Sequence, residues 1–212
     1  HRMVPFFTSN AVPLVDAWRP FWVLWLMVAL AVFEACAVWV AAYADGNHVW
    51  LAFRAVVELV AGGLLLWLAV RWGMVQSLKI RLLAMLHIGF VWLSLSILLS
   101  AVVALLEWGG TNPTYQMGVL HAVTMGFLGS LIVAMVTRVS CGHSGRKLLA
   151  DNLVWGTFWA LQLATVLRIG AAFGFTPVLL LAALTVWLLA LLPWALRLCG
   201  WYGVPRVDGK EG

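Results

Sequence analysis

Six long runs of apolar residues, separated by short polar segments, make up most of the chain. A membrane-spanning helix needs about 20 apolar residues, because the hydrocarbon core is about 30 Å thick and a helix rises about 1.5 Å per residue. The runs are continuous rather than alternating, and they are much longer than the strands of a membrane barrel. The pattern predicts an all-α membrane protein with six transmembrane helices at residues 21–43, 49–70, 82–106, 115–137, 153–175 and 177–198.

Turn-forming residues fall between the predicted helices. Asp45-Gly46-Asn47 separates the first two, residues 109–113 contain two glycines and a proline, and Thr176-Pro177 marks a tight hairpin between the last two. No internal repeat or low-complexity segment interrupts the series. We therefore expect one transmembrane helical domain over residues 1–212, with a lead-in at 1–20 and a tail at 199–212.

Composition narrows the class of protein. The 212 residues are 64% hydrophobic and 10% charged, whereas soluble domains are about half apolar and a quarter charged. A soluble enzyme, a nucleic-acid-binding protein and a disordered chain are excluded on this ground, and the expected surroundings are a lipid bilayer. The three cysteines, Cys36, Cys141 and Cys199, have no CxxC spacing and form no disulfide framework.

Basic residues predict the orientation. Of the 13 Lys and Arg residues, only Arg54 and Arg168 lie towards one side, and both are inside helices. By the positive-inside rule the other side is cytoplasmic, and an even number of spans places both termini there. That side carries Arg2, Arg19, Arg71, Lys79, Arg81, Arg138, Arg146, Lys147, Arg197, Arg206 and Lys210.

His121 is one of the ionisable residues inside the predicted spans, which are costly in a bilayer and are functional candidates. Helical spacing places Gly118, Met125 and Gly129 near the same face as His121. Such a face lets either a flat macrocycle or another helix approach the backbone closely. His121 is therefore either a ligand of haem iron or copper, or a hydrogen-bonding group in an ordinary helix contact.

His87 lies about two turns inside the predicted cytoplasmic edge of the third span. It is either a metal or haem ligand, or a histidine that snorkels towards the interface or is bonded to a nearby carbonyl. The predicted heights of His87 and His121 differ by about 12 Å in a core about 30 Å thick. We therefore expect the two histidines to serve different sites.

Charged residues in the other spans leave two interpretations open. Arg54 and Glu58 have the i,i+4 spacing of an ion pair within one helix. Alternatively, Arg54 and Arg168 bind haem propionates or another anion. Glu34 is either a protonated, hydrogen-bonded carboxyl or a proton-relay group.

The segment after the fourth span, residues 137–147, is expected to be a cytoplasmic loop with a tight turn around His143. Its basic residues suit a topology anchor, whereas Cys141 and His143 are close enough in sequence to share a soft metal. The chain contains no Ser-His-Asp arrangement, Walker loop or HExxH motif, so neither a hydrolase nor an ATPase is indicated.

Three stretches resemble one known family. Residues 2–8 are similar to its Arg-x-x-Pro-Phe-Phe-Thr segment, and residues 85–92 and 120–146 match further segments in the same order. The Gly-His-Ser-Gly-Arg run at 142–146 is the most specific element. The chain thus resembles the NnrS family of polytopic inner-membrane proteins, which contain haem and copper and are linked to nitric oxide metabolism and tolerance.

The resemblance implies haem and copper as cofactors and the bacterial cytoplasmic membrane as location. It implies His121 and His87 as metal or haem ligands, His143 as a third candidate, and Arg54 and Arg168 as partners of propionates or another anion. Family members typically have about twice as many spans, so the resemblance covers their C-terminal half. Their N-terminal His-x-His-Glu segment is absent here, and Cys141 stands where an aliphatic residue is expected.

The chain begins without an initiator methionine or a signal-peptide layout, which predicts a fragment, a processed half or one part of a split protein. Missing metal ligands would then come from an N-terminal half or a partner chain. Two other functions stay open. One is half of a small-solute or metal-ion transporter with a polar path through Glu34, Arg54, Glu58, Gln162 and Arg168. The other is a non-catalytic membrane subunit of an oxidoreductase complex.

Overall fold

The computed structural model describes residues 2–13, 16, 18–43, 47–110, 115–174 and 176–209, and all structural statements concern these residues. Within them the regular structure is entirely helical, which confirms the predicted all-α class. Six helices are long and apolar enough to cross a membrane. They are α2 (Phe21–Tyr43), α3 (His48–Arg71), α5 (Arg81–Trp108), the continuous helix Gln116–His143, α8 (Asn152–Gly174) and α9 (Pro177–Tyr202).

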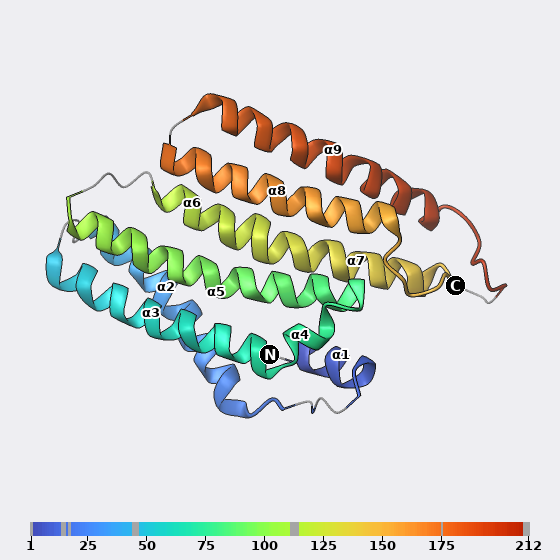
Figure 1. The fold of residues 1–212 in the computed structure, drawn as a ribbon, viewed down its shortest axis with the longest axis horizontal. Coiled ribbons are helices and arrows are strands. Elements are labelled where there is room, and N and C mark those ends of the chain that lie inside the picture. The colour runs from blue at the N-terminus through green and yellow to red at the C-terminus, as the bar shows by residue number, and fades with distance from the viewer. Residues whose placement is uncertain are drawn as a thin grey trace.

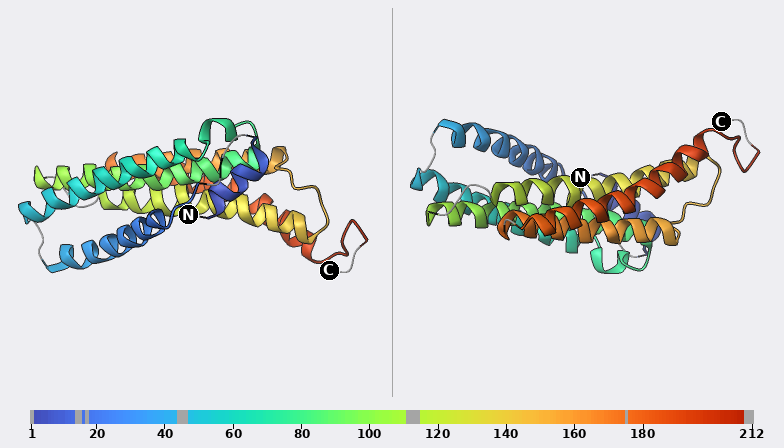
Figure 2. Two further views of the ribbon diagram at one scale, coloured as in Figure 1. Left: turned by 90° about the horizontal axis from the view of Figure 1, so that it is seen from below. Right: turned by 90° about the horizontal axis from the view of Figure 1, so that it is seen from above.

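Most of these helices lie side by side in chain order. Figure 1 shows a row running from α3 through α5 and the Gln116–His143 helix to α8 and α9. In the two views of Figure 2, α2 lies on one side of this row and diverges from α3 towards one end. The main core joins residues of α3, α5, α7 and α8, including Leu65, Met85, Val133 and Phe158.

Local chemistry explains where several helices begin and end. The side chain of Asn47 accepts hydrogen bonds from the amides of Val49 and Trp50 and so caps the N-terminus of α3. Gly73 adopts a positive φ of 83° between α3 and the short helix α4 (Met74–Ser77), a conformation that favours glycine. Pro177 begins α9, where its missing amide proton is not needed. The predicted turn residues 45–46 and 111–113 lie outside the described residues.

Basic residues gather at one end of the helix row, which we call the basic end. Arg71 is the last residue of α3 and Arg81 is the first residue of α5, while Arg138 and Arg197 each lie five residues before the last residue of their helices. This clustering matches the sequence pattern. The assignment of the basic end to the cytoplasm remains a prediction, since no membrane is present.

The predicted lead-in contains a helix of its own. Helix α1 (Met3–Ala11) packs beside α5 near the basic end. The guanidinium of Arg138 lies 4.3 Å from the ring centroid of Phe7, which joins α1 to α7 by a cation–π contact.

The prediction of a loop at residues 137–147 is wrong for the first half of this segment, because α7 (Ser130–His143) continues as a helix to His143. Contacts with α9 hold this extension. The indole of Trp194 donates to the hydroxyl of Thr137, and the hydroxyls of Ser140 and Tyr202 are hydrogen-bonded at 2.8 Å. The tight turn follows two residues later, where Gly145 has a φ of 70°.

Candidate functional site

The fourth spanning helix changes its winding directly after His121. Helix α6 (Gln116–His121) passes into a π-helical segment, η2 (Ala122–Gly129), before α7 begins. A π-helical segment inside an α-helix is rare and is frequently found at functional sites. The sequence pattern predicted one uniform helix here, so the π-helix is a feature that only the structure reveals.

Close packing surrounds the π-helical segment. A Cβ atom placed on Gly126 would lie 2.6 Å from the indole of Trp92, so α5 approaches the backbone at this point. The indole of Trp92 donates to the Gln162 side-chain oxygen at 2.6 Å, and the Gln162 amide donates to the Ser130 hydroxyl at 2.9 Å. These buried bonds connect α5, α8 and α7 and stabilise the irregular segment.

The glycines of this helix face other helices. Gly118 faces the ring of Phe173, and Gly129 faces Leu161, both on α8. Of the two open interpretations of the glycine face, the structure favours helix packing, because neighbouring side chains occupy the space that a macrocycle would need.

His121 differs from these glycines because it lines a cavity. The cavity has a volume of about 500 Å³ and lies between the fourth spanning helix, α8 and α9. Small-molecule and cofactor sites are typically 300–1,000 Å³ and mostly apolar. Its walls are His121, Thr124, Met125, Arg168, Leu180, Leu181, Ala183, Leu184 and Trp187.

The tautomer of a neutral His121 follows from its hydrogen bond. Its Nδ1 lies 2.6 Å from the carbonyl oxygen of Met117, one turn earlier. A carbonyl only accepts hydrogen bonds, so Nδ1 carries the proton and donates it. Nε2 then has a free electron pair. Histidines that ligate metals are oriented in this way, with the other ring nitrogen donating to a carbonyl or carboxylate.

Arg168 brings a positive charge to the same cavity. It also lines a second cavity of about 270 Å³ next to Leu180 and Pro177. Among the described residues, Arg168 has no hydrogen-bond or ion-pair partner, although it lies inside a spanning helix. An unpaired guanidinium at such a position is suited to a carboxylate or another anion.

His87 lies in a packed interior rather than on a cavity wall. It is fully buried, and its Nε2 is 2.8 Å from the hydroxyl of Thr8 on α1. Because that hydroxyl donates its own proton to the Val4 carbonyl, His87 Nε2 must be the donor. Nδ1 is then an unprotonated acceptor, and it has no partner among the described residues.

One metal ion cannot bind both histidines in this arrangement. Trp92 and Gly126 mark a common level on two antiparallel helices. His87 lies five residues before Trp92 and His121 lies five residues before Gly126, so they are displaced in opposite directions. With a rise of about 1.5 Å per residue, they are about 15 Å apart along the bundle.

His143 is remote from both histidines. It is the last residue of α7 and is exposed, and about 30 Å of helix separates it from His121. Cys141 is buried, whereas His143 is exposed, because residues two apart in a helix do not share a face. The helical path thus argues against the Cys141–His143 metal pair that the expected loop allowed. The role of His143 as a ligand remains a prediction.

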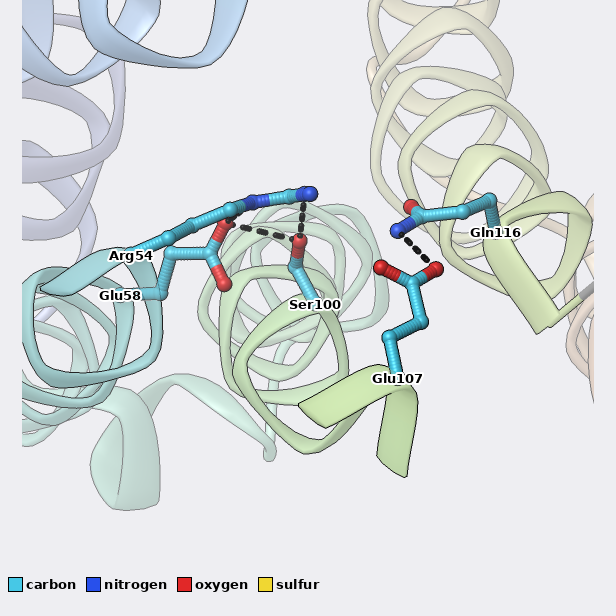
Figure 3. Close-up of polar contacts among 5 residues, drawn as sticks. All are labelled: Arg54, Glu58, Ser100, Glu107 and Gln116. Carbon is cyan, nitrogen blue, oxygen red and sulfur yellow. Dashed lines mark hydrogen bonds and ion pairs between the residues drawn. The ribbon is translucent and has the colours of Figure 1, made fainter. Parts of the chain in front are cut away.

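Arg54 takes part in a closed set of buried polar contacts. Its Nε donates to Glu58 Oε1 at 2.7 Å, and its second terminal nitrogen donates to the Ser100 hydroxyl at 2.7 Å. The Ser100 hydroxyl donates to the same Glu58 oxygen at 2.9 Å, as Figure 3 shows. The i,i+4 pair that the spacing allowed is therefore present. An anion-binding role for Arg54 remains a prediction.

Two groups of the candidate site could not be predicted from the sequence. Helical spacing puts Met125 on the His121 face but gives no sign of a role for its thioether, and in the structure Met125 lines the cavity. The Met117 carbonyl orients His121, and no side-chain pattern could reveal this backbone contact. Among the described residues no group of three or more His, Cys, Asp or Glu side chains is arranged to hold a metal ion.

The fold and the cavity together define a multi-pass α-helical membrane protein with a histidine- and arginine-lined site between its helices. The family model described as NnrS protein matches residues 1–206. The chain therefore belongs to the NnrS family, which at the family level is a group of nitric-oxide-response membrane proteins. Neither the curated proteins nor the solved structures include a match to the chain.

Proposed function

We propose that the chain binds haem in the cavity beside His121 and serves the nitric oxide response in the bacterial cytoplasmic membrane. The supporting observation is the His121 ring. Its Nδ1 is held by the Met117 carbonyl, which leaves Nε2 for iron on the wall of a cavity that also contains Arg168. Membership of the NnrS family agrees with this proposal.

The residues of the cavity fit a haem by their chemistry. Imidazole is a common haem ligand, and the apolar leucine and tryptophan walls suit the macrocycle. Arg168 lacks a partner among the described residues and supplies a cation for a propionate. Bound haem would supply an iron atom that binds nitric oxide, while the chain orients the ligand and excludes water.

Copper fits the cavity less well. Met125 offers a soft thioether beside His121, but the guanidinium of Arg168 on the same wall would repel a copper ion. The described residues contain no group of three His, Cys, Asp or Glu side chains arranged to hold a metal ion. Copper binding therefore rests on the family alone, and its ligands would come from a partner chain or an N-terminal half.

The residues of the transporter alternative fall into two groups in this structure. Arg54 and Glu58 are on α3 and pair with one another, whereas Gln162 and Arg168 are on α8. Helix α5 and the fourth spanning helix lie between them (Figure 1). This separation gives no support to a single polar path.

The test is an absorption spectrum of the purified protein in lipid, with a haemochrome assay and copper quantitation. We expect a Soret band that is lost or shifted in His121→Ala and unchanged in His48→Ala, a matched histidine on the exposed start of α3. Arg168→Gln is expected to weaken haem retention about tenfold, because a charge-assisted bond is lost. Arg71→Gln at the basic end is its control. A haem-free preparation, or an unchanged band in His121→Ala, would contradict the proposal.

A further inference from the structure

A second site lies on the other side of α5, where three ionisable side chains meet. Glu58 is fully buried and Arg54 is 7% exposed. Glu34, on α2, brings a second carboxyl group against Glu58. The Arg54–Glu58 pair is neutral by itself, so an ionised Glu34 would leave one uncompensated negative charge within the spanning helices.

Two carboxyl oxygens in this cluster have no hydrogen-bond donor among the residues that the structure describes. They are Oε1 of Glu34 and Oε2 of Glu58, and both are inaccessible to solvent. In Figure 3 one oxygen of Glu58 accepts from Arg54 and Ser100, and no hydrogen bond joins its other oxygen to the residues drawn. A buried carboxyl oxygen without a donor is costly, and a single proton between two carboxyl groups supplies the missing donor.

The charges around the two carboxyl groups favour the binding of one proton. Helix α3 contributes Arg54 as the cation that acts on both carboxyl groups, and α5 contributes only the hydroxyl of Ser100. Glu107, further along α5, accepts a hydrogen bond from the amide of Gln116 instead. With one proton on the carboxyl pair, the cluster has no net charge.

We propose that Glu34 and Glu58 share one proton at neutral pH and form, with Arg54 and Ser100, a proton-binding site embedded among the spanning helices. The site holds the proton on either carboxyl group, while the other stays ionised against Arg54. Losing the proton gives the cluster one negative charge, so the site can take up and release a proton reversibly. This proposal is independent of haem binding at His121.

Infrared spectroscopy of the full chain in lipid nanodiscs tests the shared proton. The carbonyl stretch of a protonated carboxylic acid is separate from that of a carboxylate and shifts in heavy water. We expect the wild type to show this band at neutral pH and to lose it at alkaline pH. Glu34→Gln removes the band, and Glu58→Gln does so too, because Glu34 then ionises against Arg54. Glu107→Gln, the matched control, retains it.

Three results would overturn the proposal. The first is a wild-type spectrum without the acid band at neutral pH, which does not depend on any variant folding. The second is a band that persists in both glutamine variants. The third is loss of the band on adding sodium or potassium at constant pH, which would indicate a cation site instead.

Discussion

Arg54 and Arg168 are buried to different degrees in the same helix row and have opposite surroundings. Arg54 is paired with Glu58 and Ser100 within a tightly packed contact between α3 and α5. Arg168 lies on the walls of two cavities and has no partner among the described residues. A charge in a bilayer must be neutralised. The first region achieves this within the chain, whereas the anion proposed for the cavity would do so for Arg168.

The strongest test of this comparison removes both carboxyl groups that can ionise against Arg54. We expect Glu34→Gln and Glu58→Gln each to cost about 1 kcal/mol of unfolding free energy, because the remaining carboxylate still compensates the guanidinium. The double variant leaves Arg54 buried and unpaired, which costs about 3–5 kcal/mol. Reversible unfolding in mixed micelles measures the three values. A double variant no worse than the sum of the singles would show that the carboxylates act independently.

A smaller loss of unfolding free energy is expected between the two regions, where α5 packs against η2. Gly126→Ala would place a methyl group 2.6 Å from the Trp92 ring, which must shift and disturb its bond to Gln162. Overpacking of this kind costs about 1–3 kcal/mol. Gly63→Ala on α3 has nothing within 4 Å of its new Cβ and serves as the control. Equal unfolding midpoints for the two variants would mean that α5 does not pack closely against η2.

The smallest change in unfolding free energy is expected at an exposed ion pair at the basic end. Asp151 caps α8 through the Val154 amide and pairs with Arg197 of α9. Partial burial acts to raise the pKa of Asp151, but the Val154 amide and Arg197 outweigh it and hold that pKa below its ordinary value. Asparagine is also a good cap, so Asp151→Asn removes only the charge, and about 0.2–1 kcal/mol is expected.

The pH dependence of this pair has a definite sign. Because the pKa of Asp151 is lower in the folded chain, the ion pair stabilises the fold above the ordinary aspartate pKa. That stability is lost as the pH falls through the lowered value. Unfolding midpoints of wild type and Asp151→Asn should therefore converge in acid. A constant difference over the whole range would assign the effect to packing rather than to charge.

Much of the fold was predictable because the bilayer restricts the choices. An apolar run of about 20 residues can satisfy its backbone in lipid only as a helix or in a closed barrel. The six runs therefore predicted six helices, which the structure contains. The end of the fourth helix was predicted less well. Contacts of Thr137 and Ser140 with α9 extend it to His143, and such contacts between distant segments leave no local pattern.

The candidate site was predictable only in part. His121 and Arg168 were selected because ionisable residues in a bilayer are costly, and the structure brings both to one cavity. His87 was selected by the same argument, but it is buried against Thr8 in a packed interior. The cost of placing an ionisable side chain in a bilayer identifies unusual residues. It does not tell whether such a residue lines a cavity or is packed against its neighbours.

The sequence by itself determined the membrane class, the number of spanning helices, the i,i+4 pair of Arg54 and Glu58, and the concentration of basic residues at one end. Each of these depends on composition or on neighbours within one helix. Only the tertiary structure decided that Glu34 meets Glu58, that the helix winds differently after His121, and that Arg168 faces a cavity. These features depend on the distances between helices, which side chains far apart in the chain set by packing against one another.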